Sequence, residues 1–247
     1  MFSIFKKKNT AVSSNYFPIS TDIHSHILPG IDDGSPNIQT SLELITGLIN
    51  LGVNKSIATP HIIGDLYKNN ATTINTALKE LQNAIAQNKI NFEIKAAAEY
   101  MLDSYFFELL QQKAHLLTLQ NNIILTEFSY ADKPYNVEQM LYTIITEGYQ
   151  PILAHPERYA YFHNDYKQYN HLSDIGFLLQ VNILSLTGYY GKPVAKAAAY
   201  IIKNDLASFT ATDLHHQRHL QALQHPQNKQ IFANIFAGKT LNQEIIF

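Results

Sequence analysis

Apolar segments typical of buried strands alternate with helical patterns along almost the whole chain, and this alternation is what most constrains the fold. Seven segments are mostly continuous apolar runs, as in strands that are covered on both faces. They lie near Ile19–His26, Val53–His61, Phe92–Glu99, Asn122–Phe128, Pro151–His155, Phe177–Asn182 and Ala207–Asp213. Repeated βα units of this kind predict a parallel sheet with helices packed on its faces.

Helical periodicity fills the intervals between these strands. One apolar helix face comprises Ile38, Leu42, Ile45 and Ile49, and a second comprises Ile74, Leu78, Leu81 and Ile85. Ser35-Pro36 predicts the start of the first helix and Gly52 predicts its end. Further helices are expected near Ser104–Ala114, Val137–Glu147, Tyr166–Gly176, Lys192–Asn204 and Gln217–Phe236.

The number of βα units indicates the fold. Seven or eight units predict an α/β protein with a closed, TIM-like barrel, whose active site lies at the C-terminal ends of the strands. An open, doubly wound sheet is the alternative, although the chain has neither GxGxxG after a strand nor a P-loop. No linker-like stretch interrupts the series, so we expect one domain over residues 18–247. Residues 1–17, which include three consecutive lysines, are expected to form a flexible tail.

The composition excludes several classes of protein. The 247 residues are 46% hydrophobic and 15% charged, with a net charge of −2. This is enough apolar material for a core, and it lacks the basic excess of a nucleic-acid binder. The absence of cysteine excludes disulfides, thiolate nucleophiles and Cys-ligated metals. No apolar run approaches the ~20 residues that span a bilayer, and the N-terminus lacks the order of a secretory signal. We therefore expect a cytoplasmic protein.

Side chains that bind metals stand at the ends of six of the predicted strands. His24 and His26 end the first strand, and side chains at i and i+2 of a strand point the same way. A barrel brings all its strand ends to one mouth, where distant donors converge. The candidate ligands are His24, His26, Asp33, His61, Glu99, Glu127, His155, Asp213 and His215. Nine N and O donors suit two or three divalent ions, and leave zinc, manganese, iron and magnesium open.

Neighbouring polar residues leave alternatives open. Asp32 and Asp33 are adjacent, and either can bind metal or cap the turn. Asp22 is expected to orient a ligand histidine or to hold the loop. The other histidines have no place at a strand end and are assigned mostly to the surface: His115, His163, His171, His216, His219 and His225.

The two arginines of the chain, Arg158 and Arg218, each follow a candidate ligand, His155 or His215, by three residues. A guanidinium group matches phosphate oxygens with two parallel hydrogen bonds. Beside a metal cluster, two such groups suit a phosphate ester, which a metal-activated hydroxide attacks while the arginines neutralise the equatorial oxygens. His155 and His215 are candidate proton donors to the leaving group. Aromatic residues near strand ends could line a slot for an aromatic leaving group: Tyr100, Phe128, Tyr130, Tyr159 and Tyr189.

Several strings at these strand ends form a recognisable set: DIHSHILPGIDDG, ATPHI, AAAEYMLD, LTEFS, ILAHPERY, QVNILSLTGYYG and ATDLH. Together they resemble the PHP (polymerase and histidinol phosphatase) superfamily, and within it the bacterial capsule and exopolysaccharide tyrosine-protein phosphatases of the CpsB/YwqE type. The likeness extends from about Thr21 to beyond Arg218, and ILPGIDDG and HPERY are its specific strings. An Asn often follows the final His in that family, with an Arg later, whereas this chain has His216 and the early Arg218.

The resemblance implies a distorted seven-stranded (β/α) barrel and up to three metal ions, often manganese. It assigns metal binding to the nine residues given above, with Asp33 rather than Asp32, and phosphate binding to Arg158. It also implies removal of phosphate from tyrosines in the C-terminal tail of a membrane-associated tyrosine autokinase that controls polysaccharide export. The alternatives are a phosphatase for a small metabolite such as histidinol phosphate, a metal-dependent amidohydrolase, and a non-catalytic metal-binding module.

Overall fold

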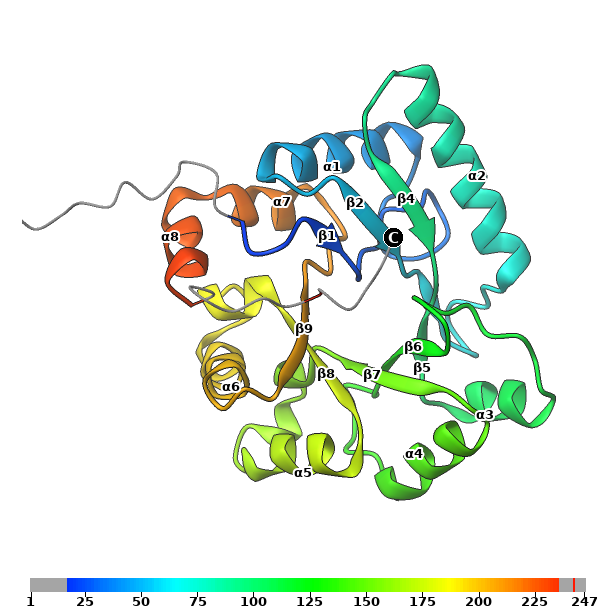
Figure 1. Ribbon diagram of the computed structural model, residues 1–247, viewed down its shortest axis with the longest axis vertical. Coiled ribbons are helices and arrows are strands. Elements are labelled where there is room, and N and C mark those ends of the chain that lie inside the picture. Colours follow the sequence, from blue (N-terminus) through cyan, green and yellow to red (C-terminus); the bar gives the residue numbers. More distant parts are fainter. Residues whose placement is uncertain (1–16, 236–241, 243–247) are drawn as a thin grey trace, which may run out of the picture.

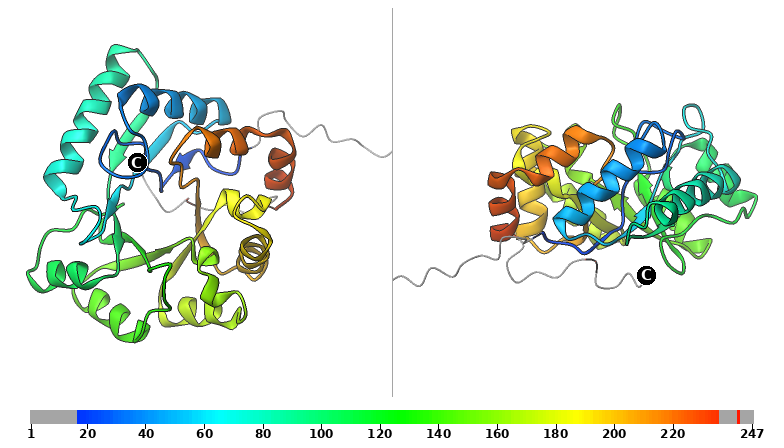
Figure 2. Two further views of the ribbon diagram at one scale, coloured as in Figure 1. Left: turned by 180° about the vertical axis from the view of Figure 1, so that it is seen from behind. Right: turned by 90° about the horizontal axis from the view of Figure 1, so that it is seen from above.

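The computed structural model describes residues 17–235 and 242 (Figure 1). The strands are β1 (Thr21–Asp22), β2 (Lys55–Ala58), β3 (His61–Ile62), β4 (Glu93–Ala96), β5 (Glu99–Met101), β6 (Ile123–Glu127), β7 (Gln150–Ala154), β8 (Leu178–Asn182) and β9 (Ala207–Ala211). The α-helices are α1 (Ile38–Leu51), α2 (Ala71–Gln87), α3 (Ser104–Gln111), α4 (Val137–Thr146), α5 (Lys167–Ile175), α6 (Lys192–Lys203), α7 (Gln217–Gln224) and α8 (Pro226–Ile235). The short 3-10 helices are η1 (Pro156–Arg158), η2 (Ala160–Phe162) and η3 (Ile183–Thr187). Helices surround the strands when the molecule is seen from either side (Figures 1 and 2).

Each of the seven predicted strand regions contains at least one strand, and all named strand pairs are parallel. The second predicted strand is divided into β2 and β3 by Thr59-Pro60, because proline has no N–H for a sheet hydrogen bond. The third is likewise divided into β4 and β5. The repeated βα pattern therefore predicted the parallel arrangement correctly.

The strands form two hydrogen-bonded sheets, with the orders β1-β2-β4 and β3-β5-β6-β7-β8-β9. Backbone bonds continue across the break, since Ala97 N–H donates to Ala58 O (2.8 Å) and Glu99 N–H donates to Pro60 O (3.1 Å). A parallel bridge pairs Ser25 with Leu214, so the first and last strand regions also lie side by side. The α/β single-domain fold is confirmed, while one continuous closed barrel stays a prediction.

Two apolar clusters fill the fold. The larger one lies between helices and strands and includes Leu44 of α1, Leu81 of α2 and Ile201 of α6. The smaller one takes side chains from successive strands and the segments beside them, namely Ile23, Ile57, Ala97, Leu119, Leu125, Ile152, Ala154, Phe209 and Ala211. The side chains of the smaller cluster pack against one another, and this packing fixes the strand ends that carry the polar residues described next.

Two helix boundaries differ from the prediction. The first helix begins at Ile38 rather than at Ser35-Pro36, because extended Asn37 is its cap and accepts the Thr40 N–H (3.0 Å). Gly52 ends this helix in the left-handed region, as predicted (φ 95°). The single helix predicted over Gln217–Phe236 is two helices, because His225 precedes a proline and is extended.

Residues 1–16 of the predicted N-terminal tail lie outside the described residues. Phe17, the last residue of that predicted segment, packs its ring edge-on against Phe232, with ring centroids 5.9 Å apart. Within the described part of the chain, none of the helices combines the length and apolar character that crossing a bilayer requires.

Candidate metal centre and phosphate site

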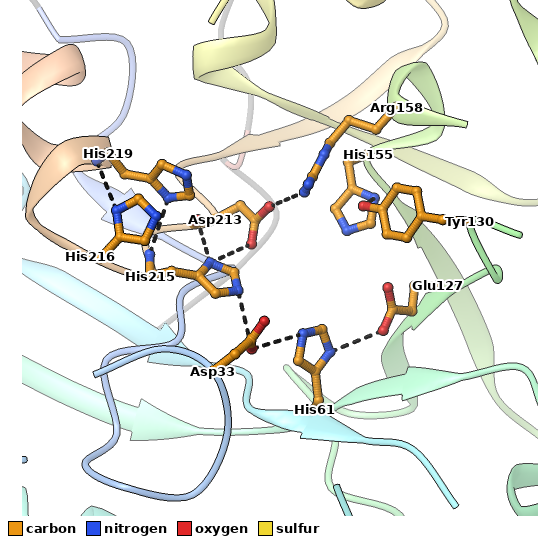
Figure 3. Close-up of a pocket in the computed structure, with 10 residues that line it drawn as sticks. All are labelled: Asp33, His61, Glu127, Tyr130, His155, Arg158, Asp213, His215, His216 and His219. Carbon is orange, nitrogen blue, oxygen red and sulfur yellow. Dashed lines mark hydrogen bonds and ion pairs between the residues drawn. The ribbon is translucent and has the colours of Figure 1, made fainter. Parts of the chain in front are cut away.

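The C-terminal ends of the strands surround a cavity of about 280 Å³ (Figure 3). It receives side chains from the ends of β3 and β6 and from the segments after β1, β6, β7 and β9, as expected for parallel strands that end at one edge. The lining residues are Asp33, His61, Glu127, Tyr130, His155, Arg158, Asp213, His215, His216 and His219. Residues separated by up to 186 positions therefore meet at one site.

All nine predicted metal ligands belong to four overlapping groups of N and O donors. Within each group the donor atoms lie within 4.8 Å of one another. The groups are His26, Asp33, His61 and His215; His24, His26 and Asp213; His24, Glu99 and His155; and His61, Glu99 and Glu127. Shared members connect the groups, so this arrangement has the form of adjacent sites joined by bridging residues.

Glu99 lies at the centre of the cluster. Its Oε2 is 3.3 Å from Nε2 of both His24 and His26, and 3.1 Å from Nδ1 of His61. Its Oε1 is 3.0 Å from His155 Nε2. Both oxygens of one carboxylate thus face imidazole nitrogens, which is the geometry of a bridging ligand.

Three buried donor atoms of the cluster make no hydrogen bond: His61 Nδ1, Glu99 Oε2 and Glu127 Oε1. These atoms lie 3.0–3.3 Å from one another or from His24 and His26 as ion pairs, yet none of them has hydrogen-bond geometry, and buried polar atoms without a hydrogen bond need an explanation. The Nε2 atoms of His24 and His26 also face each other at 3.2 Å. Divalent cations would satisfy all of these atoms, so the donor set fits a metal cluster built from imidazoles and carboxylates.

Partners outside the cluster fix the orientation of the imidazole rings. Asp32 Oδ2 is 2.7 Å from His26 Nδ1 and also accepts the His61 N–H (3.2 Å). Gln180 Oε1 lies 2.8 Å from His24 Nδ1. In both histidines, therefore, Nε2 points inward to the cluster. This geometry separates the two adjacent aspartates, because Asp32 orients a histidine and Asp33 faces the cavity.

Asp22 connects the first and last strand regions of the fold. Its carboxylate accepts hydrogen bonds from the Thr212 N–H and hydroxyl, directly before Asp213. The expectation that Asp22 holds the neighbouring loop therefore agrees with its contacts. Two ligand residues, His155 (φ 35°) and Asp213 (φ 50°), occupy the left-handed backbone region where they leave their strands. Non-glycine residues are uncommon there, and such strain often occurs at functional sites.

The electrostatics of the cluster favour cations. At His26, burial lowers the pKa, but the carboxylates of Asp32 and Glu99 outweigh it and raise the pKa to about 10. Burial raises the pKa of Glu99, yet His24 and His61 hold it well below its usual range. Burial also raises the pKa of Asp213, but His24, His215 and Arg158 outweigh it and hold this pKa well below its usual range. The Glu99 and Asp213 carboxylates are therefore ionised and require positive charge nearby.

Arg158 is the arginine that reaches the cavity. Its Nη1 donates to Asp213 Oδ2 (2.7 Å), and its guanidinium lies over the rings of Tyr130 (5.2 Å) and Tyr190 (4.5 Å). Burial lowers its pKa, but Asp213 more than compensates and the pKa is raised. Arg218, also predicted to bind phosphate, is exposed on α7 and does not line the cavity. The i+3 spacing places the two arginines differently because Arg158 ends the 3-10 helix η1, whereas Arg218 lies in the first turn of the α-helix α7.

Most of the aromatic residues that were predicted to line a slot do not line the cavity. Tyr100, Phe128 and Tyr159 are buried and do not line the cavity. Tyr100 Oη accepts the Leu117 N–H (2.7 Å), and Tyr159 Oη donates to Ala154 O (3.1 Å). Their polar atoms are thus used within the core, which corrects the expectation that they form the wall. Tyr130 does line the cavity. Tyr189 is exposed and is not among the lining residues.

Two histidines of the cavity were assigned to the surface by the sequence. His219 is buried, and His216 is the cap of α7, where its Nδ1 accepts the His219 N–H (3.3 Å). Because His216 Nδ1 is an acceptor, the neutral ring carries its proton on Nε2. Burial lowers the pKa of His219 to about 3. Their positions at i+1 and i+4 from His215, at a helix start, are the sequence signal that could have identified them.

The chain was compared with known proteins. Residues 20–235 match the profile of a family described as capsular polysaccharide synthesis, CpsB/CapC. Tyrosine-protein phosphatase YwqE of Bacillus subtilis is 29% identical over 194 residues, which cover 78% of this chain and 76% of YwqE. Tyrosine-protein phosphatase CpsB of Streptococcus pneumoniae is 28% identical over 201 residues, covering 78% of this chain and 82% of CpsB.

Two solved structures are similar. One belongs to a set of crystal structures of YwqE from Bacillus subtilis and CpsB from Streptococcus pneumoniae, described as metal-dependent tyrosine phosphatases. It has a TM-score of 0.78 and 27% identity, and the match covers 89% of this chain and 87% of that one. The other is a histidinol phosphate phosphatase of Lactococcus lactis, with zinc, L-histidinol and phosphate bound. Its TM-score is 0.54 at 14% identity, covering 90% and 94% of the two chains.

Proposed function

The chain belongs to the CpsB/CapC family, and we propose that it is a metal-dependent protein-tyrosine phosphatase. One observation carries this proposal: the four overlapping donor groups and the Arg158 guanidinium face the same cavity. The metal cluster and the phosphate-binding cation that a phosphomonoesterase requires are thus within reach of one substrate.

The residues of the chain have separate tasks in this reaction. His24, Glu99 and the other seven donors would hold two or three divalent ions, for which we propose manganese. When bound, such ions polarise phosphoryl oxygens and activate water for attack on phosphorus. Arg158 binds the phosphoryl oxygens through the N–H groups of its guanidinium that do not donate to Asp213, and compensates the negative charge that grows on these oxygens. Tyr130 limits the cavity beside it and orients the phenol ring of phosphotyrosine.

The contacts of His155 and His215 suit metal binding better than proton donation to the leaving group. Nδ1 of His155 lies 3.2 Å from the Tyr130 hydroxyl, and Nδ1 of His215 lies 2.9 Å from the Asp213 carbonyl oxygen. The Nε2 atoms of both rings are turned to carboxylates of the cluster, Glu99 and Asp33. Both imidazoles are thus oriented as metal ligands, and we assign them that role.

The biological setting follows from the family. We propose that the substrate is the tyrosine-rich C-terminal tail of a membrane-associated bacterial tyrosine kinase that controls capsule or exopolysaccharide synthesis. The phosphatase would meet this tail in the cytoplasm. We also propose that the two sheets act together as the interrupted PHP-type barrel, with the cavity as its mouth. The pairing of Ser25 with Leu214 and the inner apolar cluster support this arrangement.

A phosphate-release assay tests the proposal. Purified protein with measured metal content is given a phosphotyrosine peptide, a phosphoserine peptide and histidinol phosphate, before and after chelation. We expect hydrolysis of the phosphotyrosine peptide, its loss on chelation and its return with Mn²⁺. Preference for histidinol phosphate would replace the proposal by the small-metabolite alternative. Amide hydrolysis without phosphatase activity would replace it by the amidohydrolase alternative.

A further inference from the structure

A second cavity, which we call the side groove, opens beside the catalytic cavity and has a volume of about 540 Å³. It is lined by residues of the loop after β6, the start of α4, η2 and α5. These residues are Asp132, Lys133, Pro134, Tyr135, Asn136, Val137, Glu138, Phe162, Gln168, His171 and Leu172. None of them lines the catalytic cavity. The size of the groove exceeds that of the catalytic cavity, so it can accept a bulky side chain.

The side groove is continuous with the catalytic site along the chain. Tyr130 lines the catalytic cavity and Asp132 lines the groove. One residue separates them, so their Cα atoms are at most ~7.6 Å apart. The groove is also bordered by the N-terminal halves of α4 and α5. In a parallel arrangement, these helix starts lie at the same edge as the C-terminal ends of the strands. Both cavities therefore open at one edge of the fold.

A row of contacting aromatic rings connects the linings of the two cavities. The ring of Tyr159 lies 5.3 Å from that of Tyr130 and is stacked on that of Tyr161 at 5.5 Å. The Tyr161 ring contacts Phe162, which lines the groove, edge-on at 4.7 Å. The Tyr161 hydroxyl also donates to Ser129 O (3.0 Å), which ties this row to the loop after β6. Packed side chains therefore join the groove to the rim of the catalytic cavity.

The chemistry of the groove favours an apolar ligand. Its floor contains the buried side chains of Phe162, Leu172 and Val137. At its rim, His171 Nε2 lies 2.8 Å from Glu138 Oε1, and Lys133 Nζ donates to Gln168 Oε1 (3.1 Å) and lies 5.8 Å from the centre of the Phe162 ring. The rim carries the carboxylates of Asp132 and Glu138 beside Lys133, which disfavours an anion, and the apolar floor suits an aliphatic or aromatic side chain.

We propose that the side groove binds an apolar side chain of the substrate polypeptide, two or three residues away from the phosphotyrosine. The proposal rests on the proposed function, since a protein substrate must continue over the rim of the catalytic cavity. An extended peptide advances ~3.3 Å per residue, so two or three residues span the short distance across the Tyr130–Asp132 rim. The groove thus holds a residue of the same polypeptide whose phosphotyrosine binds at Arg158, and it selects for the sequence around that phosphotyrosine.

The test compares substrates of two sizes in surface variants. Gln168→Trp fills the groove, Tyr135→Ala removes a side chain from its rim, and Tyr142→Ala is the control, since Tyr142 is exposed on α4 outside the groove. The substrates are p-nitrophenyl phosphate and two phosphotyrosine peptides. One peptide has leucine at the positions two and three residues on either side of the phosphotyrosine, and the other has alanine there.

For unmodified protein we expect kcat/KM to be about tenfold higher for the leucine peptide, the ratio that burial of one apolar side chain produces. Gln168→Trp should remove this preference and leave p-nitrophenyl phosphate hydrolysis within about twofold, and Tyr142→Ala should change neither. Equal rates for both peptides in unmodified protein, or equal losses on both substrate sizes in Gln168→Trp, would overturn the proposal. Absence of any phosphotyrosine hydrolysis by the metal-loaded protein would instead refute the proposed function itself.

A second measurement uses binding alone. The chain contains no tryptophan, so Tyr135→Trp introduces a single fluorescent reporter at the groove. With a non-hydrolysable phosphonate analogue of the leucine peptide, we expect a blue shift of its emission. Phosphate alone, or the alanine peptide, should give none. The same shift with both peptides would contradict selection by the groove.

Discussion

Replacing Arg158 with alanine should separate phosphate binding from metal binding. The Arg158 guanidinium is held by Asp213 Oδ2 at 2.7 Å and by two tyrosine rings, so it is oriented before substrate arrives. Asp213 Oδ2 also accepts a hydrogen bond from Asn182 Nδ2 (2.7 Å), so its carboxylate keeps a partner in the variant. We therefore expect Arg158→Ala to fold and to retain its metal.

The size of the effect follows from the bonds that are lost. A hydrogen bond to a charged group contributes about 1.5–3 kcal/mol, and the guanidinium fork can make two of them to a phosphoryl group. Because 24% of the Arg158 side chain is exposed, the lower part of this range applies. The sum is about 3 kcal/mol, which corresponds to a loss of about two orders of magnitude in kcat/KM. Arg158→Lys should recover only part of it, since lysine lacks the planar fork.

The assay is hydrolysis of a phosphotyrosine peptide with excess Mn²⁺, together with metal analysis of each sample. The matched control is Arg218→Ala, the same change at the exposed arginine of the chain, which should stay within about twofold of unmodified protein. An Arg158→Ala variant within threefold of unmodified protein would refute the reasoning. So would a loss that disappears once metal content is equalised, because Arg158 would then act through Asp213.

Four further outcomes are expected. His24→Ala or Glu127→Ala should abolish turnover and lower the bound metal while leaving the circular dichroism spectrum unchanged; retained activity would remove those residues from the mechanism. Asp32→Ala should weaken metal affinity by about 10–100-fold, because it frees the His26 ring; unchanged affinity in a metal titration would contradict this. Mn²⁺ at about 100 times its Kd should stabilise chelated protein by about 2.7 kcal/mol and raise Tm by roughly 5–10 °C, which calorimetry can check. The fourth concerns His216→Ser, which keeps a capping side chain on α7 but removes an imidazole that lines the cavity. This variant should raise KM more than it lowers kcat. Equal effects on KM and kcat would instead indicate damage to the neighbouring candidate ligand His215.

The sequence predicted which nitrogen- and oxygen-bearing side chains would converge, because strand ends have few alternatives. His24, Glu99 and Asp213 each stand where an apolar run stops, and parallel strands bring such positions to one edge. A buried charge at such a position needs a partner, so the polar residues there identified the site without knowledge of side-chain geometry.

The choice between Asp32 and Asp33 could not be made from the residue pattern. It depends on a turn in which Asp32 accepts the Gly34 N–H (3.0 Å), and this turn directs its carboxylate to His26 rather than to the cavity. Helix starts were also uncertain, since Asn37 caps the first helix although Ser35-Pro36 has the stronger signal. Local hydrogen bonds, which depend on neighbours distant in sequence, decide such positions.

Arginine and aromatic residues were predicted less well because spacing does not give direction. The same spacing of three residues sends Arg158 into the cavity and leaves Arg218 on an exposed helix face. Tyr100 and Tyr159 also lie near strand ends, but their hydroxyl groups have backbone partners in the core. His219 was missed because its burial depends on α7 packing beside the cavity, and its position four residues after His215 at a helix start was the one signal of this in the sequence.

The pairing of the first and last strand regions has a consequence for biosynthesis. Asp22 bonds to Thr212, and His24 and His26 stand opposite Asp213 and His215. A ribosome that has translated only the first two hundred codons has therefore produced most of the candidate metal ligands but neither Asp213 nor His215. We therefore expect a nascent chain to gain the complete set of candidate ligands only after Asp213 and His215 have been synthesised, and a fragment that stops before them to be inactive.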